Sequence, residues 1–177
     1  MAAVLVLGVS CAGKSSLVIE LTCRGLVAVD SDETLGHWTD RAGRLVWCPP
    51  CPDRDWLAGH RWRWDSQELD SLLGQAAGTL FVCGSAQNSA DFIDCFELTV
   101  LLKVDTATIL RRLKDPTRGN DYGRTDDTRE HLLEWAPGFQ ARMEELGATV
   151  VDARRPIGAV ADAVVRLACE HGLLSPN

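Results

Sequence analysis

The chain of 177 residues has no long apolar run, no internal repeat and no low-complexity tract. No run approaches the roughly 20 apolar residues of a membrane-spanning helix, which argues against a membrane partner. The opening apolar run, residues 2–7, is too short for the core of a signal peptide and follows no basic residues. We therefore expect a cytoplasmic protein.

Positive charge is also scarce, because 18 Lys and Arg stand against 25 Asp and Glu and the net charge is −7. A nucleic-acid-binding surface is usually basic, so this balance argues against a nucleic acid as partner. The length fits one domain with its own core, residues 1–177, as a monomer or a homodimer.

The chain has seven cysteines, and this odd number fits free thiols better than a disulfide framework. We expect four of them to be small core residues, because they lie among apolar or small neighbours: Cys11, Cys83, Cys95 and Cys169. Cys48 and Cys51 have C-x-x-C spacing, but no second such pair completes a zinc site. His37 and His60 could complete one, yet we favour a proline turn with two free thiols.

The most informative segment is Gly8-Val-Ser-Cys-Ala-Gly-Lys-Ser15, which fits the phosphate-binding pattern G-x-x-x-x-G-K-[ST]. It lies between a predicted strand, 2–7, and a predicted helix, 16–22. Backbone N–H groups of such a loop and the helix N-terminus point at phosphate oxygens. Lys14 would reach the β- and γ-phosphates of ATP, and the Ser15 hydroxyl would be a ligand for Mg²⁺. The residues assigned to ATP here are Gly8, Ser10, Cys11, Ala12, Gly13, Lys14, Ser15 and Ser16.

Apolar runs alternate with helix-forming runs along the whole chain. The predicted strands are 2–7, 26–29, 79–83, 98–104 and 148–151. This alternation predicts an α/β fold, a five-stranded parallel sheet with helices on both faces. Ligands bind at the carboxyl ends of the strands in such sheets. That rule gathers four loops into one site: 8–15, 30–32, 84–88 and 152–156.

The boundaries of other elements are less regular. Ser66 is the predicted N-cap of a helix that ends near Ala76, and Asp126 or Asp127 is the predicted cap of a helix over 128–146, interrupted near Pro137.

Residues 33–64 hold five of the six tryptophans without a clean period. We predict an irregular insertion with short helices there, which covers the acceptor side. The acceptor-side residues are predicted to be Asp32, Gly84, Ser85, Asn88 and Trp64.

Asp30 and Asp32 lie two residues apart at the end of a predicted strand, beside the phosphate loop. One carboxylate can hold Mg²⁺ together with Ser15, and the other can accept the proton of an incoming hydroxyl. A turn that only caps the next helix is the alternative. Asp30 is our metal candidate and Asp32 our substrate candidate, but the residues alone leave the base unassigned.

Basic residues gather between positions 111 and 129, in an otherwise acidic chain. Glycines punctuate residues 114–125, which predicts a lid loop that closes over phosphates and excludes water. Arg118 and Arg124 lie in this lid and are our candidates for contacting the transferred phosphoryl group. A solvated helix face is the alternative for some of these charges.

With these motifs the chain resembles the small P-loop kinases, the nucleoside-monophosphate-kinase-like group that includes shikimate and gluconate kinases. Asp30-Ser-Asp32 is similar to the shikimate kinase D-x-D, in which the first Asp attends the metal and the second the acceptor. The chain is also similar to chloramphenicol phosphotransferase, where the Asp of a Val-Asp-Ser turn is the base, which would be Asp30. Gly84 matches one glycine of the shikimate kinase G-G-G turn. The resemblance implies that adenine lies between Arg111 or Arg112 and the turn of Arg155 and Pro156.

The sequence thus predicts a kinase that transfers the γ-phosphate of ATP, with Mg²⁺, to a hydroxyl of a small metabolite, nucleoside or antibiotic. A nucleotide-binding regulator is the first alternative, although no N-K-x-D guanine signature follows a strand. A polynucleotide end kinase is the second, against which the acidic balance argues.

Overall fold

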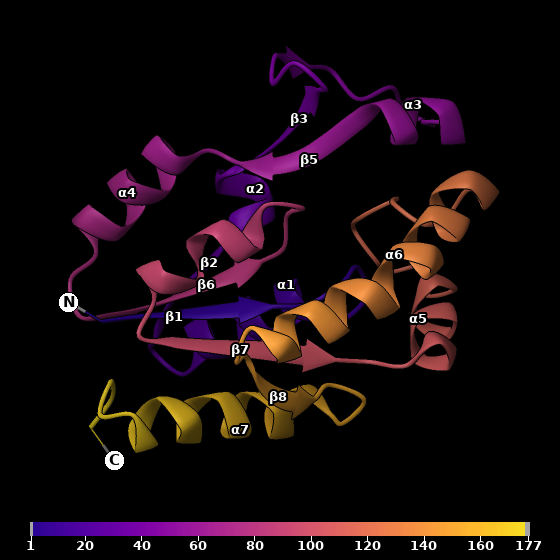
Figure 1. Cartoon of the computed structure of the whole chain (residues 1–177). Coiled ribbons are helices and arrows are strands. Elements are labelled where there is room, and N and C mark those ends of the chain that lie inside the picture. Colours follow the sequence, from indigo (N-terminus) through magenta and orange to yellow (C-terminus); the bar gives the residue numbers. More distant parts are fainter. Residues whose placement is uncertain (1, 176–177) are drawn as a thin grey trace.

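The computed structural model describes residues 2–175, and a five-stranded parallel sheet lies at its centre (Figure 1). In sheet order the strands are β2 (Val27–Asp30), β6 (Thr79–Gly84), β1 (Ala2–Leu7), β7 (Leu98–Lys103) and β8 (Thr149–Asp152). The predicted α/β fold is therefore confirmed. The three inner strands are almost wholly buried because helices cover both faces of the sheet, which explains their unbroken apolar sequences.

Eight helices surround the two sheets within residues 2–175: α1 (Lys14–Cys23), α2 (Ser31–Thr34), α3 (Arg54–Gly59), α4 (Ser66–Gln75), the 3-10 helix η1 (Ser89–Cys95), α5 (Thr106–Leu113), α6 (Asp126–Glu145) and α7 (Ile157–Glu170). Helices α1 and α7 pack against each other. In Figure 1, α6 crosses in front of β7, whereas α1 lies behind the sheet. No helix in this part of the chain is both long and apolar enough to cross a bilayer.

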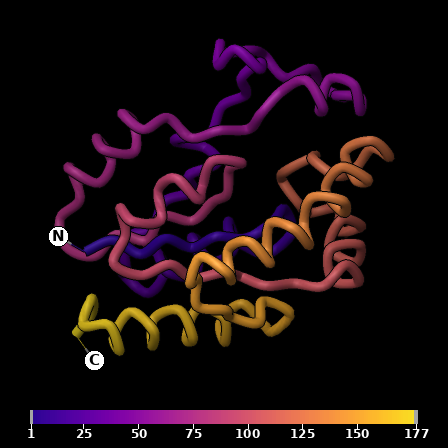
Figure 2. Tube along the Cα trace, in the orientation of Figure 1, coloured from indigo at the N-terminus to yellow at the C-terminus, as the bar shows by residue number. Residues whose placement is uncertain are grey.

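Residues 33–64 contain a second sheet, so the prediction of an irregular insertion is wrong, although α3 is one of the short helices predicted there. Strands β3 (Gly36–Asp40), β4 (Leu45–Val46) and β5 (His60–Trp64) pair antiparallel in the order β4-β3-β5. Figure 2 shows this small sheet apart from the main one, on the same side as the upper end of α6. The alternation of Arg and Trp over residues 61–64 is a strand signal that the sequence contains.

Two predicted helix caps are wrong by one or two residues. Asp65, rather than Ser66, caps α4, and its carboxylate accepts two backbone N–H groups of the first turn. Thr125, rather than Asp126 or Asp127, caps α6. Each true cap has an extended backbone conformation, as an N-cap requires, whereas its predicted counterpart is already helical.

Helix α6 continues through Pro137, so the predicted interruption is also wrong. A proline inside a helix removes one backbone hydrogen bond and favours a break. Here the helix is held by its packing, because Ala136, Phe139 and Met143 recur at helical spacing and are all buried.

Of the four cysteines predicted in the core, Cys83 is buried and Cys11 and Cys169 are half-buried. Cys95 is exposed, and for this residue the prediction is wrong. It is the last residue of η1, where the short helix faces solvent before the chain enters β7.

Candidate functional site

The strand register brings the four predicted loops to one edge of the main sheet. Leu7 is opposite Gly84, Asp30 is opposite Cys83, and Lys103 is opposite Asp152. Because the strands are parallel, the loops that follow them all emerge at this edge. They border a cavity of about 1170 Å³, together with the lid and part of the small sheet.

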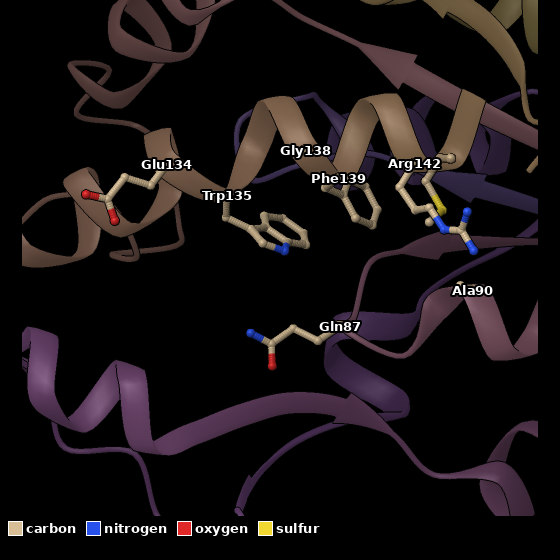
Figure 3. A pocket seen from close by; sticks show the side chains of 8 residues that line it. Gln87, Ala90, Glu134, Trp135, Gly138, Phe139 and Arg142 are labelled. Atoms are coloured by element: carbon tan, nitrogen blue, oxygen red, sulfur yellow. The ribbon is translucent and has the colours of Figure 1, made fainter. Parts of the chain in front are cut away.

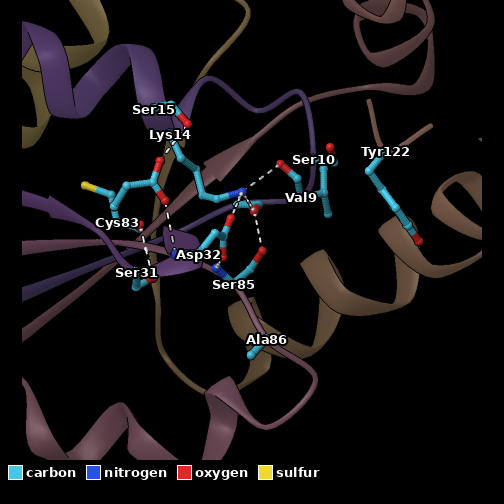
Figure 4. A network of polar contacts seen from close by, with 12 residues as sticks. Val9, Ser10, Lys14, Ser15, Ser31, Asp32, Cys83, Ser85, Ala86 and Tyr122 are labelled. Carbon is cyan, nitrogen blue, oxygen red and sulfur yellow. Dashed lines mark hydrogen bonds and ion pairs between the residues drawn. The ribbon is translucent and has the colours of Figure 1, made fainter. Parts of the chain in front are cut away.

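The phosphate loop curls tightly between β1 and α1. Cys11 has a φ of 68° and Gly13 a φ of 101°, both in the left-handed region. Lys14 is buried, and its Nζ donates to the Gly8 carbonyl at 2.9 Å (Figure 4). The same Nζ lies 3.5 Å from Asp32 Oδ2. A buried ammonium needs such partners, so the loop holds Lys14 beside the carboxylate turn.

The two aspartates of this turn have different partners. Ser15 donates its hydroxyl to Asp30 Oδ2 at 2.6 Å, and Asp30 Oδ1 also accepts the Asp32 N–H at 3.1 Å. Asp32 accepts the Ser85 N–H at 3.1 Å with one oxygen and faces Lys14 with the other. Asp30 therefore caps α2 and also joins Ser15 at the start of α1, whereas Asp32 is paired with the loop lysine.

The lid reaches the phosphate loop through Arg118. One terminal nitrogen of Arg118 donates to Ser10 Oγ at 2.9 Å and to the Tyr122 carbonyl at 2.8 Å. The other is buried and has no hydrogen-bond partner among residues 2–175. Arg124 donates to the Arg118 carbonyl at 2.8 Å and pairs with Asp121. Arg118 thus faces the loop, and Arg124 supports the backbone behind it.

The residues predicted to contact adenine do not all lie at the cavity. Arg112 donates to the Cys11 carbonyl at 2.8 Å and to the Ala153 carbonyl at 2.6 Å, which ties the phosphate loop to the turn after β8. Burial and then the neighbouring Arg111 lower the pKa of Arg112. Arg112 and Arg155 line the cavity, whereas Arg111 is exposed outside it. Pro156 is the N-cap residue of α7.

Three of the predicted acceptor residues, Trp64, Gly84 and Asn88, are not among the residues that line the cavity. The Asn88 side chain accepts the backbone N–H of Trp64 and donates to the Trp64 carbonyl, both at 3.0 Å, and both residues are buried. A side chain at position 84 would collide with Ser31, because a Cβ there would lie 1.6 Å from its Oγ. Ser85 does line the cavity, and its hydroxyl donates to the Gly8 carbonyl at 2.8 Å.

Several residues that the sequence analysis did not assign line the cavity. Trp38 and Trp62 come from the small sheet, and Trp135 comes from α6. Gln87 and Trp135 also line an adjoining chamber of about 460 Å³, in which their side chains point toward each other (Figure 3). No local signal tells a cavity-lining tryptophan from a core tryptophan, since Trp64, two residues after Trp62, is buried.

A tyrosine and a histidine meet on the wall between the lid and α6. The Tyr122 hydroxyl lies 2.6 Å from His131 Nδ1, and both residues line the cavity. Burial raises the pKa of Tyr122 and lowers that of His131. The hydroxyl therefore stays protonated and can donate to a neutral imidazole near pH 7.

No zinc site forms in the part of the chain that the structure describes, because no three His, Cys, Asp or Glu side chains cluster as metal ligands. His60 stacks on Trp56 at a centroid distance of 4.2 Å and contacts the Trp56 carbonyl through Nδ1. Cys48 and Cys51 are free thiols that line the cavity.

No protein-family model matches this chain, and no curated protein sequence matches it. Solved structures do share its fold. A shikimate kinase from Acinetobacter baumannii in complex with shikimate has a TM-score of 0.62 at 13% identity, over 98% of this chain and 96% of that one. A gluconokinase from Sinorhizobium meliloti has a TM-score of 0.57 at 16% identity, over 99% and 98%.

A deoxyadenosine kinase from M. mycoides, with the products dCMP and a flexible dCDP bound, has a TM-score of 0.56 at 13% identity, over 95% of this chain and 99% of that one. The chain therefore has the fold of the small P-loop kinases, as the sequence resemblance implied. At such low identities the likeness establishes the fold, and the chemistry must be argued from the site.

Proposed function

We propose that this protein transfers the γ-phosphate of ATP to a hydroxyl group of a small molecule. The proposal rests on one observation: two carboxylates lie at one edge of the cavity, and each contacts a different residue of the phosphate loop. Asp30 lies 2.6 Å from the Ser15 hydroxyl, and Asp32 lies 3.5 Å from the Lys14 ammonium. The solved structures with the same fold are named as kinases of small molecules, which is consistent with the proposed function.

The phosphate end of the cavity is built for negative charge. The loop N–H groups and the start of α1 hold the β- and γ-phosphates, and Lys14 neutralises the charge that develops during transfer. Arg118 adds a buried guanidinium nitrogen without a partner among the described residues, which a phosphate oxygen would satisfy. Arg112 and Arg155 border the adenine side.

The donor set beside α1 fits Mg²⁺, because a hydroxyl and a carboxylate are the hard oxygen ligands that this ion prefers. Ser15 and Asp30 would hold it. Mg²⁺ held there would offset the charge of the nucleotide phosphates.

Asp32 is the proposed base. It faces the lysine that would contact the γ-phosphate, and its second oxygen is oriented by the Ser85 N–H. An acceptor hydroxyl next to Asp32 can pass its proton to this carboxylate as the oxygen attacks phosphorus, while ADP leaves on the opposite side.

The test is a library of small hydroxyl compounds, screened for ADP release that depends on the acceptor, with Lys14→Ala as the paired variant. We expect acceptor-dependent ADP release from the wild type and a loss of about 10²–10³-fold in the variant, because Lys14 acts on developing charge. Circular dichroism controls for folding. Near-normal turnover in a folded variant, or nucleotide binding without any acceptor-dependent transfer, would contradict the proposal, the latter favouring a regulator.

A further inference from the structure

The acceptor end of the cavity has an aromatic wall. Trp38 and Trp62 are cross-strand partners in the small sheet, with ring centroids 5.6 Å apart, and both line the cavity. Trp56 of α3 packs edge-on against Trp38, with ring centroids 4.8 Å apart. Cross-strand aromatic pairs stabilise each other's positions, so the rings of this wall support one another.

The fold fixes how the Trp62 ring lies. A Cβ at position 36 would lie 2.1 Å from the Trp62 ring, so only glycine leaves room for the indole beside β3. The Trp62 carbonyl also accepts the Gln87 N–H at 2.9 Å, which joins the small sheet to the loop after β6. Trp135 lines the cavity from α6 and is held by stacking on Phe139 at 4.4 Å. Aromatic surfaces therefore reach the cavity from two elements far apart in sequence.

Charge is distributed unevenly around the same cavity. Its lysine and arginines, among the described residues, come from the phosphate loop, α5, the lid and the turn after β8: Lys14, Arg112, Arg118, Arg124 and Arg155. The acceptor end has the carboxylates of Asp32, which faces Lys14 at 3.5 Å, and Glu33. Arg142 lines the adjoining chamber and pairs with Glu145 at 3.4 Å. His131 there has a pKa lowered by burial, so it is neutral near pH 7.

Two arginines near the small sheet, Arg54 and Arg61, already have partners within the protein. Arg54 pairs with Glu130 and Glu134 on α6, at 2.8 and 2.9 Å. Arg61 donates to the Ala58 and His60 carbonyls. An anionic group at the acceptor end would therefore meet carboxylates and indole faces, which carry negative electrostatic potential.

We propose that the acceptor carries a flat ring and no carboxylate or phosphate, as a nucleoside or another ring-bearing alcohol does. This proposal rests on the kinase function proposed above and deepens it. The ring stacks on the face of Trp62, with Trp135 closing the opposite side, and the reacting hydroxyl points to Asp32. Base–aromatic stacking of this kind strengthens binding by about tenfold to a hundredfold, enough for selectivity without a charged anchor.

The test uses pairs in the acceptor library that share a ring and differ in charge: adenosine with adenosine monophosphate, thymidine with thymidine monophosphate, and benzyl-type alcohols with their carboxylated counterparts. Gluconate and shikimate serve as anions without an aromatic ring. We expect acceptor-dependent ADP release from neutral ring-bearing members, at a kcat/KM at least about tenfold above that of the anionic member of the pair. An acceptor that needs its carboxylate or phosphate, or that has no flat ring, overturns the proposal while leaving the kinase function intact. Absence of transfer to any library member counts against both.

Variants of the wall give a second readout. Trp62→Ala should raise the KM for the acceptor by about tenfold and leave the KM for ATP unchanged, since stacking is lost only at the acceptor end. Trp47→Ala is the matched control, because Trp47 is 92% exposed and lies outside the cavity. If Trp62→Ala does not fold, Trp62→Leu serves in its place. An unchanged acceptor KM in the folded variant overturns the proposal.

A charge insertion tests the same idea in the opposite direction. Gln87 lines the acceptor end and points toward Trp135 (Figure 3). Gln87→Arg should shift the preference within each pair toward the anionic member, by about tenfold, because it supplies a cation beside Trp135 where the wild type has a neutral amide. No shift in a folded Gln87→Arg variant means that charge at this end does not select the acceptor.

Discussion

Asp30 and Asp32 are separated by one residue, yet the fold gives them different neighbours. Asp30 contacts the hydroxyl of Ser15, and Asp32 contacts the ammonium of Lys14. A carboxylate beside a metal ligand and one beside the transferred group should respond differently when neutralised. If Asp30 supports the metal and Asp32 accepts the proton, as proposed, kinetics can measure the two roles separately.

Neutralising each aspartate should produce a distinct defect. Asp30→Asn should raise the Mg²⁺ concentration for half-maximal activity by about 10–100-fold, as loss of a metal-supporting group does. Asp32→Asn should lower kcat by about 10²–10⁴-fold with little change in ATP affinity, because only the transition state uses the base. Steady-state rates across a Mg²⁺ titration make the comparison.

Asp70→Asn is the control for this pair, since Asp70 is exposed on α4. Wild-type rates in both site variants at every Mg²⁺ concentration would reduce the turn to a helix cap. The opposite assignment, a kcat defect in Asp30→Asn and a Mg²⁺ defect in Asp32→Asn, would exchange the two roles.

His131 should make the stability of the protein depend on pH. Burial is the largest cause of its lowered pKa, with Glu134 opposing and Arg54 and Arg61 reinforcing the shift. Between that lowered pKa and the ordinary value of 6.5, the unfolded chain binds a proton that the folded chain does not. The contribution of His131 to the free energy of unfolding should therefore be complete above pH 6.5 and be lost as the pH falls through this window.

The effect should be modest, because the ring is only half-buried and solvent screens it. Urea denaturation at a series of pH values measures it, and His131→Gln should flatten this part of the profile. His171→Gln is the control, because His171 is exposed at the end of α7. A profile that keeps its slope in His131→Gln assigns the pH dependence to other groups.

At the scale of whole elements, the lid and α6 form the wall opposite the small sheet. Arg118 in the lid contacts Ser10 of the phosphate loop, and Tyr122 contacts His131 on α6. The backbone of residues 114–125 has few internal hydrogen bonds, whereas α6 is a continuous helix. Local opening should therefore cost much less in the lid than in the helix that it leans on.

Nucleotide should order the lid. Amide exchange of residues 114–125 should slow on addition of a non-hydrolysable ATP analogue with Mg²⁺, and slow further with the acceptor, because phosphate charge then pairs with Arg118. Replacing Arg118 and Arg124 together by alanine should lower kcat more than ATP affinity. Exchange measured by mass spectrometry and steady-state kinetics report the two effects.

Arg166→Ala is the matched control for the lid variant, since Arg166 is exposed on α7. Exchange that nucleotide leaves unchanged, or normal turnover of the double variant, would make the segment an ordinary surface loop. Its arginines would then contribute to solubility rather than to transfer.

The whole molecule should be stabilised by its ligand, because the cavity is assembled from both sheets, the lid and α6. A ligand that binds only the folded state at 100 times its Kd adds about 2.7 kcal/mol, which raises Tm by about 5–10 °C for a chain of this size. We expect such a shift with a non-hydrolysable ATP analogue and Mg²⁺ in a thermal melt.

Chelation of Mg²⁺ should remove most of this shift, and Lys14→Ala should reduce it, since both weaken phosphate binding. Mg²⁺ without nucleotide is the control and should change Tm little. A full shift in the presence of chelator would show that the nucleotide binds without the ion that Ser15 and Asp30 are proposed to hold.

Several features of this protein follow from local sequence. The phosphate loop carries its chemistry in consecutive residues, Gly8 to Ser15, so its recognition needs no knowledge of the fold. The inner strands are unbroken apolar runs, because a parallel sheet covered on both faces needs them. The order of strands and helices then placed Asp30 and Asp32 at the edge of the sheet that bears the loop.

Other features depend on contacts between distant segments. Whether Trp62 or Trp64 faces the cavity is decided by the pairing of β5 with β3 and by the space that Gly36 leaves for an indole. Asn88 hydrogen-bonds the backbone of Trp64, which is 24 residues away in the sequence. Arg112 joins two loops, and its partner Cys11 is 101 residues away. Register and packing set these neighbours, and neither is encoded in any short stretch of sequence. The sequence alone therefore determined the half of the cavity that we propose binds phosphate, and the tertiary structure decided what lines the half that we propose binds the acceptor.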